Sequence, residues 1–209
     1  MISDKQSETL DGIETLMYDS GRSPMAAELG EHLGVERTVL ARRLERLARA
    51  GYLQPRSNRH LPLELTQTGL RAVGAIVPIL GSIRGGPLSE ALEEPSGYLR
   101  LPRAHRDARR QFALRVSGDS MSDTICPDDV VLLEFADRRD PRQGEIVAVQ
   151  VGSEYETTLK YFHSEGEQVT LRAENPRYQP IVVPANELSL LGYFVGRMSP
   201  SIAALFLST

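Results

Sequence analysis

The sequence predicts an α+β protein of two domains, the first helical and the second mostly β. Over residues 1–72, apolar side chains recur every three or four positions, as on one face of an α-helix. From Val77 onward, short apolar runs are separated by Gly, Pro and Asp, a pattern typical of strands joined by turns. A chain of 209 residues can bury two modest cores. We therefore expect domains at residues 1–72 and 91–209, joined by a connector at residues 73–90.

The first domain is expected to contain three helices in succession. Apolar positions 10, 13, 16 and 17 share one helical face, which predicts a first helix over about residues 5–19. A second helix is predicted to begin with Ser23 as N-cap and Pro24 at the first helical position, and to end at Gly34. The third follows this glycine and ends before Gly51. Two short helices joined by a tight glycine turn are a helix-turn-helix arrangement.

A hairpin is predicted after the third helix. Residues 52–54 and 61–65 have the composition of short strands, and a polar turn at residues 56–59 separates them. With this wing, the first 72 residues resemble winged-helix transcription regulators, and residues 65–70 are similar to the wing-to-helix ending of MarR-type and related repressors. The resemblance implies a winged helix-turn-helix domain that binds double-stranded operator DNA.

The charge of the chain is unevenly distributed. The formal net charge of −4 argues by itself against a nucleic-acid partner. Between Glu36 and His60, however, arginine occupies positions 37, 42, 43, 46, 49, 56 and 59, against glutamate at positions 36 and 45 only. Phosphate contacts depend on the charge at the docking face, so this cationic segment carries more weight than the sum.

The third helix and the wing supply the predicted DNA contacts. A recognition helix presents its early residues to base edges in the major groove. On this basis we expect base contacts from Arg37 and Arg42, with Thr38 and Arg46 on the same side, phosphate contacts from Arg43, Arg56 and Arg59, and Asn58 at the wing tip. The alternative is a solvated helix in which Glu45 pairs with Arg42 or Arg49.

The second domain is predicted from a series of apolar runs. The expected strands are 112–116, 130–135, 145–151, 155–162, 169–172, 181–183 and 188–198. The connector segment at residues 75–88 is too apolar for a free linker. We expect it to be extended and docked on the second domain.

Two residues of the second domain have the chemistry of a catalytic pair. The chain has lysine at positions 5 and 160 only, and Lys160 lies in an expected strand among apolar and aromatic neighbours, where an ammonium ion is poorly solvated. Ser120 follows an apolar strand at a turn that contains Gly118. Taken singly, the serine is most simply a turn residue and the lysine a surface residue. Together they are the material of a Ser-Lys dyad, provided that the lysine pKa falls by about 3 pH units, or roughly 4–5 kcal/mol.

Motifs spread over residues 78–200 resemble the LexA-type family of Ser-Lys autoproteases. The matching segments are Arg115-Val116-Ser117-Gly118-Asp119-Ser120-Met121, Pro127-Asp128-Asp129-Val130-Val131-Leu132, Lys160, Asn175-Pro176-Arg177-Tyr178-Gln179-Pro180-Ile181 and Gly192-Tyr193-Phe194-Val195-Gly196. The resemblance implies a mostly-β domain of the LexA and signal-peptidase fold, with Ser120 as nucleophile and Lys160 as general base. The implied substrate is a peptide bond in the chain's own connector.

The family pattern places the scissile bond at Gly85-Gly86. The usual family bond is Ala-Gly or Cys-Gly after small apolar residues, so this segment departs from the pattern at Gly85 and at Arg84. A connector that docks but is cut slowly or not at all is the alternative. Residues 120–125 are also similar to the serine motif of signal peptidases, but those enzymes are membrane-anchored and this sequence has no apolar anchor.

The resemblance also implies partners. We expect a LexA-like repressor that dimerises through its second domain, loses operator affinity on self-cleavage, and takes a RecA-type recombinase filament as co-protease in the DNA-damage (SOS) response. The alternative is a non-cleaving or phage-type repressor whose protease-like domain acts only in dimerisation and sensing. A cytoplasmic protein is expected, since no apolar run spans a bilayer and no signal peptide is recognisable. No metal or other cofactor is expected, because His32, His60, His105, His163 and the single Cys126 lack ligand spacing.

Overall fold

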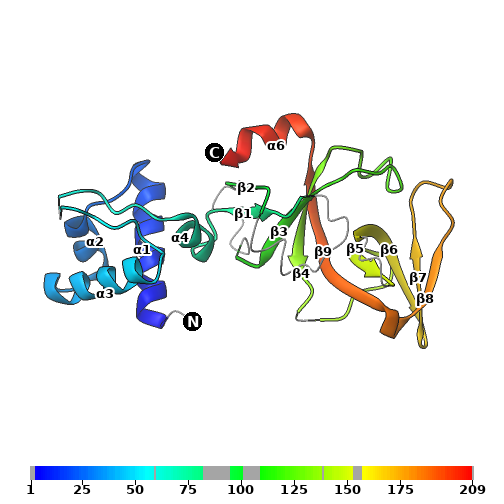
Figure 1. Ribbon diagram of the computed structural model, residues 1–209, viewed down its shortest axis with the longest axis horizontal. Coiled ribbons are helices and arrows are strands. Elements are labelled where there is room, and N and C mark those ends of the chain that lie inside the picture. The colour runs from blue at the N-terminus through cyan, green and yellow to red at the C-terminus, as the bar shows by residue number, and fades with distance from the viewer. Residues whose placement is uncertain are drawn as a thin grey trace. The chain divides into compact units, whose positions relative to one another are not determined.

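The computed structural model describes residues 3–58, 60–81, 95–100, 109–137, 139–152 and 157–208. The chain forms two compact units: of the described residues, the first contains those up to Ile76 together with Arg109, and the second contains the rest. The first unit is helical and the second is built on a β-sheet (Figure 1). Each unit has its own core.

The first unit packs helices around a leucine-rich core. Its helices are α1 (Asp4–Ser20), α2 (Ala26–Leu33), α3 (Arg37–Arg49) and α4 (Gln67–Ala72). The first and third helices lie where the periodicity predicts them, and Gly51 has the left-handed φ of 78° expected after a helix end. The buried core side chains are Leu10, Ile13, Leu29, Leu40, Leu44, Leu47, Leu53, Leu63 and Leu65.

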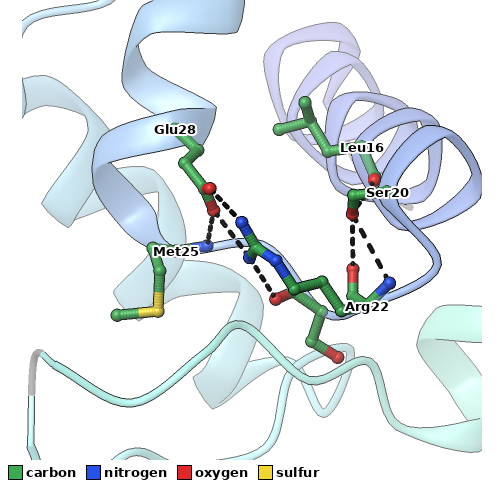
Figure 2. Close-up of polar contacts among 6 residues, drawn as sticks. Leu16, Ser20, Arg22, Met25 and Glu28 are labelled. Atoms are coloured by element: carbon green, nitrogen blue, oxygen red, sulfur yellow. Dashed lines mark hydrogen bonds and ion pairs between the residues drawn. The ribbon is translucent and has the colours of Figure 1, made fainter.

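The predicted start of the second helix is wrong. Helix α2 begins at Ala26, with Met25 rather than Ser23 as its N-cap residue. Figure 2 shows the reason: Arg22 donates to both carboxylate oxygens of Glu28, and Glu28 Oε2 accepts a 2.6 Å hydrogen bond from the Met25 backbone N–H. The hydrogen bond from Arg22 lowers the pKa of Glu28 to about 2. An acidic side chain in the first turn is also favoured by the helix dipole, so the helix starts where Glu28 can cap it.

The hairpin predicted after the third helix is present in reduced form. A single antiparallel bridge joins Leu53 to Leu65, and the Gln54 N–H donates to the Glu64 carbonyl at 2.9 Å. Thr66 then caps α4, its Oγ1 accepting from the Gly69 N–H at 3.1 Å. A Cβ on Gly69 would lie 2.1 Å from the Tyr52 carbonyl oxygen, so this close approach requires glycine. The two extended segments are therefore fixed at the α4 end.

The described part of the second unit forms a ten-stranded sheet. The strands are β1 (Val77–Ile79), β2 (Gly97–Leu99), β3 (Gln111–Arg115), β4 (Val130–Phe135), β5 (Glu145–Val151), β6 (Thr157–Glu165), β7 (Gln168–Arg172), β8 (Ile181–Pro184), β9 (Leu188–Met198) and β10 (Leu207–Ser208). Their order is β10-β2-β1-β3-β4-β9-β5-β6-β7-β8. All seven predicted strands are present. Strand β2, the 3₁₀ turn η2 (Ala185–Glu187) and the terminal elements α6 (Pro200–Phe206) and β10 were not predicted.

Strand β9 joins two halves of this sheet and lies between β4 and β5 (Figure 1). It pairs antiparallel with both strands, and both pairings contain a register shift. Such irregularities increase the local twist and bend of a strand. A Cβ on Gly192 of β9 would lie 2.6 Å from the Glu134 carbonyl oxygen, so glycine permits the close packing at this crossing.

The start of the predicted connector lies in the sheet of the second unit. Residues Val77–Ile79 form β1, which pairs antiparallel with β2 and parallel with β3 through Ile79 and Ala113. The Leu80 N–H donates to the Ala113 carbonyl at 2.9 Å. The expectation of an extended, docked segment is thus confirmed for this stretch. Gly85, Gly86 and Arg84 lie outside the described residues.

Candidate active site

Ser120 lies in a turn that follows β3 and is anchored by apolar side chains. The neighbouring Met121 is 2% exposed and Ile125 is fully buried. The Val116 N–H donates to the Asp129 carbonyl at 2.9 Å, and the Asp128 N–H donates to the Val116 carbonyl at 2.8 Å. These two hydrogen bonds close the base of the turn. The Ile125 N–H donates to the Met121 carbonyl at 2.7 Å. The turn therefore presents Ser120 from a packed base rather than from a free loop.

Lys160 lies in the middle of β6, opposite Val147 of β5. The residue is only 4% exposed. Burial lowers the pKa of Lys160 to about 8, because an ammonium ion is poorly solvated inside the fold. No carboxylate contacts this amine among the residues that the structure describes, so its charge has no ionic partner there.

Among the described residues, the Lys160 amine has three short contacts with oxygen. Its Nζ lies 2.8 Å from Ser120 Oγ, 2.7 Å from Thr158 Oγ1 and 2.9 Å from the Leu159 carbonyl oxygen. A neutral amine has two N–H donors and one lone pair. Donation to Thr158 and Leu159 would leave that lone pair to accept the Ser120 O–H, so the neutral form satisfies all three contacts.

Sequence reasoning missed the role of several residues around this pair. Thr158 could have been found, since it lies two positions before Lys160 and so on the same face of the strand. Glu174, Asn175 and Tyr178 contact the turn that carries Ser120. Asn175 and Tyr178 belong to a segment quoted above for the family resemblance, but the sequence alone gave no contact for them.

The predicted DNA-contacting residues fall into two groups. Arg37, Thr38, Arg42 and Arg46 are exposed on α3. Arg43 is half-buried instead, and its Nη1 lies 2.9 Å from Glu8 Oε2 of α1. The alternative pairing of Glu45 is realised with Arg49, at 2.7 Å.

The hairpin residues are partly engaged within the hairpin itself. Arg56 Nη1 donates to the Leu61 carbonyl at 3.1 Å, and burial lowers the pKa of this guanidinium. Asn58 Oδ1 accepts from the His60 N–H at 2.9 Å, so Asn58 shapes the turn at the tip. Arg59 lies outside the described residues.

Two further properties of the described ranges bear on function. No helix within them is long and apolar enough to cross a membrane. Their His, Cys, Asp and Glu side chains form no group of three or more that could hold a metal ion.

Comparison with known proteins places the second unit in a class of serine peptidases. Residues 78–195 match the family model described as Peptidase S24-like. This span covers more than half of the chain and contains both Ser120 and Lys160.

Curated relatives extend the similarity over most of the chain. It is 32% identical over 194 residues to the LexA repressor of Thermotoga neapolitana, with 92% of this chain and 94% of that protein covered. It is 30% identical over 203 residues to the LexA repressor of Geotalea uraniireducens, with coverage of 93% and 96%. The LexA repressor of Alcanivorax borkumensis is 29% identical over 197 residues, with coverage of 93% and 94%. The chain belongs to the LexA-type members of the Peptidase S24-like family.

Proposed function

We propose that this protein is a transcriptional repressor that inactivates itself by cutting its own connector. Ser120 is the nucleophile and Lys160 the general base of this reaction. The observation that carries the proposal is the 2.8 Å contact between Ser120 Oγ and the buried Lys160 Nζ. A base must lie within hydrogen-bond reach of the proton that it removes and have a pKa near the working pH. Both the distance and the pKa of about 8 support this role.

The reaction begins with proton transfer from Ser120 Oγ to the Lys160 amine. Oγ bonds to the carbonyl carbon of the scissile residue, for which we propose Gly85. The lysine ammonium then donates its proton to the leaving nitrogen of Gly86, the C–N bond breaks, and an ester to Ser120 remains. Water activated by the same amine hydrolyses this ester and restores the serine. The products are fragments 1–85 and 86–209.

The tether makes this reaction intramolecular. Strand β1, at the start of the connector, pairs in parallel with β3, and the Ser120 turn follows β3. A substrate held on the same sheet as its nucleophile has a high effective concentration, and effective molarities for well-oriented groups reach about 10⁵–10⁸ M. A modest dyad can therefore cut a bond in this segment.

The proposed first domain, residues 1–72, is a winged helix-turn-helix that binds operator DNA. The support is the exposed arginine face of α3, the hairpin that follows it, and the repressor relatives that match along most of the chain. The proposed connector is residues 73–90, and residues 91–209 pair two chains into a dimer. Cutting the connector separates the DNA-binding domains from their dimeriser, which removes an avidity that can reach about 10²–10⁴. A RecA-type filament that favours the docked connector would make this an SOS switch.

The test is the mass of the fragments formed by the purified full chain at pH 6–10, with and without an activated recombinase filament. We expect fragments 1–85 and 86–209 from the wild type, and an intact chain from Ser120→Ala and Lys160→Ala. Fragments of other masses would mean that the scissile bond lies elsewhere in the chain. An intact wild type under every condition would leave a repressor whose second domain serves only in dimerisation and sensing.

A further inference from the structure

Ser120 and Lys160 come from parts of the sheet that do not pair with each other. The turn that bears Ser120 follows β3, and Lys160 lies in β6. In the sheet order, β4, β9 and β5 separate these two strands. Strand pairing alone therefore does not fix the distance between the hydroxyl and the amine.

The loop between β7 and β8 spans this separation. Strand β7 pairs antiparallel with β6, and its last residue, Arg172, lies opposite Tyr161. The loop that follows β7 therefore begins directly beside the strand that carries Lys160. Residues 174–178 of the loop hydrogen-bond to the Ser120 turn at both of its ends. The loop thus connects the sheet half of the lysine to the turn of the serine.

At one end of the turn, the contacts converge on Asp119 and Ser120. The Asn175 backbone N–H donates to the Ser120 carbonyl at 3.0 Å, and Asn175 Nδ2 donates to the Asp119 carbonyl at 3.1 Å. The Tyr178 hydroxyl donates to Asp119 Oδ1. Asn175 Oδ1 in turn accepts from the Arg177 N–H at 3.1 Å, which orders the loop itself.

At the other end, Glu174 makes two contacts with Thr124. Its Oε1 accepts from Thr124 Oγ1 at 2.8 Å, and its Oε2 accepts from the Thr124 N–H at 3.1 Å. Hydrogen bonds to an ionised acceptor are shorter and stronger than neutral ones. Four residues after Ser120, the turn is therefore fixed to the same loop a second time.

We propose that Glu174, Asn175 and Tyr178 form a clamp that positions the Ser120 hydroxyl against the Lys160 amine and keeps water from that amine. The clamp deepens the proposed function, because it assumes that Ser120 and Lys160 act as nucleophile and base. Its members are positioning residues, since they touch the turn and not the reacting atoms. Within the described ranges, the groups that contact the amine itself are the Ser120 and Thr158 hydroxyls and the Leu159 carbonyl. Releasing the turn would remove the first of these and admit solvent.

The two lysines of this chain allow a direct measurement. Selective ¹⁵N labelling of lysine gives signals for Lys5 and Lys160 alone, and Lys5, exposed in α1, serves as the reference. We expect Lys160 to titrate near 8 in the wild type. In full-length Asn175→Ala and Glu174→Ala the midpoint should rise, because water then reaches the amine. Loss of fold stability alone would leave the midpoint of the folded fraction unchanged.

Serine reactivity provides the second measurement. A fluorophosphonate probe forms a bond from Ser120 Oγ to phosphorus, the P–F bond breaks, fluoride leaves, and the hydroxyl proton passes to Lys160. We expect labelling at pH 8 to be about 10- to 100-fold slower in Asn175→Ala and Glu174→Ala, since a misplacement of about 1 Å can cost this much. Labelling should be slower in Thr124→Val and should keep about the wild-type rate in Thr124→Ser, because only serine keeps the hydroxyl donor.

Gln179→Ala is the matched control, since Gln179 is an exposed residue of the same loop that lies outside the clamp. It should label and titrate like the wild type. Wild-type titration and labelling in both Asn175→Ala and Glu174→Ala would overturn the clamp. A wild type that titrates near 8 but is neither labelled nor cut would instead overturn the proposed function, and a midpoint raised in the variants would still support the clamp.

Discussion

The two units use cationic side chains in opposite surroundings. In the second unit, Lys160 is 4% exposed and has hydroxyl and carbonyl neighbours. In the first unit, Arg37 and Arg42 are exposed on α3, while Arg43 is paired with Glu8. Burial favours loss of the proton from a lysine, whereas an arginine stays charged and keeps its fork of donors for phosphate or base edges. A buried lysine is therefore suited to accept a proton, and exposed arginines are suited to attract DNA.

The largest expected effect comes from replacing the buried, titratable cation with one that stays charged. Lys160→Arg keeps a positive charge but replaces a titratable amine with a guanidinium that stays protonated. We expect self-cleavage to fall by about 10⁴-fold or more, as it should in Ser120→Ala, since members of a catalytic unit act together. Fragment formation at pH 8 measures this. Lys5→Arg is the control, and equal rates in Lys160→Arg and the wild type would remove Lys160 as the base.

The pH dependence tests the same cation without a substitution. Because only the neutral amine can accept the serine proton, the rate should follow the deprotonated fraction of Lys160. With a pKa of about 8, the rate rises about tenfold per pH unit well below that value, or about fiftyfold from pH 6 to pH 8, and levels off above about pH 9. Initial rates of fragment formation across this range check the profile. A rate that keeps rising tenfold per unit to pH 10 would indicate a lysine with its ordinary pKa.

Arg42 and Arg43 test the exposed side of the comparison. They are adjacent in sequence, but Arg42 is exposed on α3 and Arg43 is paired with Glu8 at 2.9 Å. We expect Arg42→Ala to weaken operator binding by about 1–3 kcal/mol and to reduce its salt dependence. Arg43→Ala should weaken binding less, because its charge is already compensated. Fluorescence anisotropy at several salt concentrations measures both, and a larger loss in Arg43→Ala would reverse the assignment.

The sequence predicts some of these features because the signal is local. Lys160 stands out as a rare lysine in an apolar strand, and Ser120 follows a strand at a glycine turn, so both can be recognised without knowing which strands pair. The start of α2 was misjudged because Ser23 and Pro24 have favourable propensities, but the Arg22–Glu28 pair moves the cap to Met25. Propensity is a weak term that such tertiary or capping contacts override.

The clamp illustrates what local signals do not carry. Glu174 and Thr124 are separated by 50 positions, and Asn175 and Asp119 by 56. Their contacts depend on how a sheet with an irregular central strand bends, which no window of sequence records. The short α6 was missed for a different reason: Ser199 and Pro200 form a recognisable helix start, but the helix they begin has only seven residues.

The smallest expected effect concerns stability, which replacement of Lys160 should raise at neutral pH even though it removes activity. The folded pKa of Lys160, about 8, lies below the ordinary value of 10.5, so the folded protein binds fewer protons than the unfolded chain between these values. The stability of the wild type should therefore rise with pH from about 8 to 10.5, and below pH 8 the full cost of the buried charge applies.

Lys160→Met removes this cost. The pKa difference corresponds to on the order of 3 kcal/mol, and the lost hydrogen bonds to Thr158 and Leu159 offset about 1 kcal/mol each. At pH 7 we expect the variant to be more stable by about 1 kcal/mol, with the gain gone by pH 10. Urea unfolding at both pH values measures the difference, with Ser120→Ala as the inactive reference that keeps the lysine. A variant less stable than this reference at pH 7 would mean that the lost hydrogen bonds contribute more than the buried charge costs.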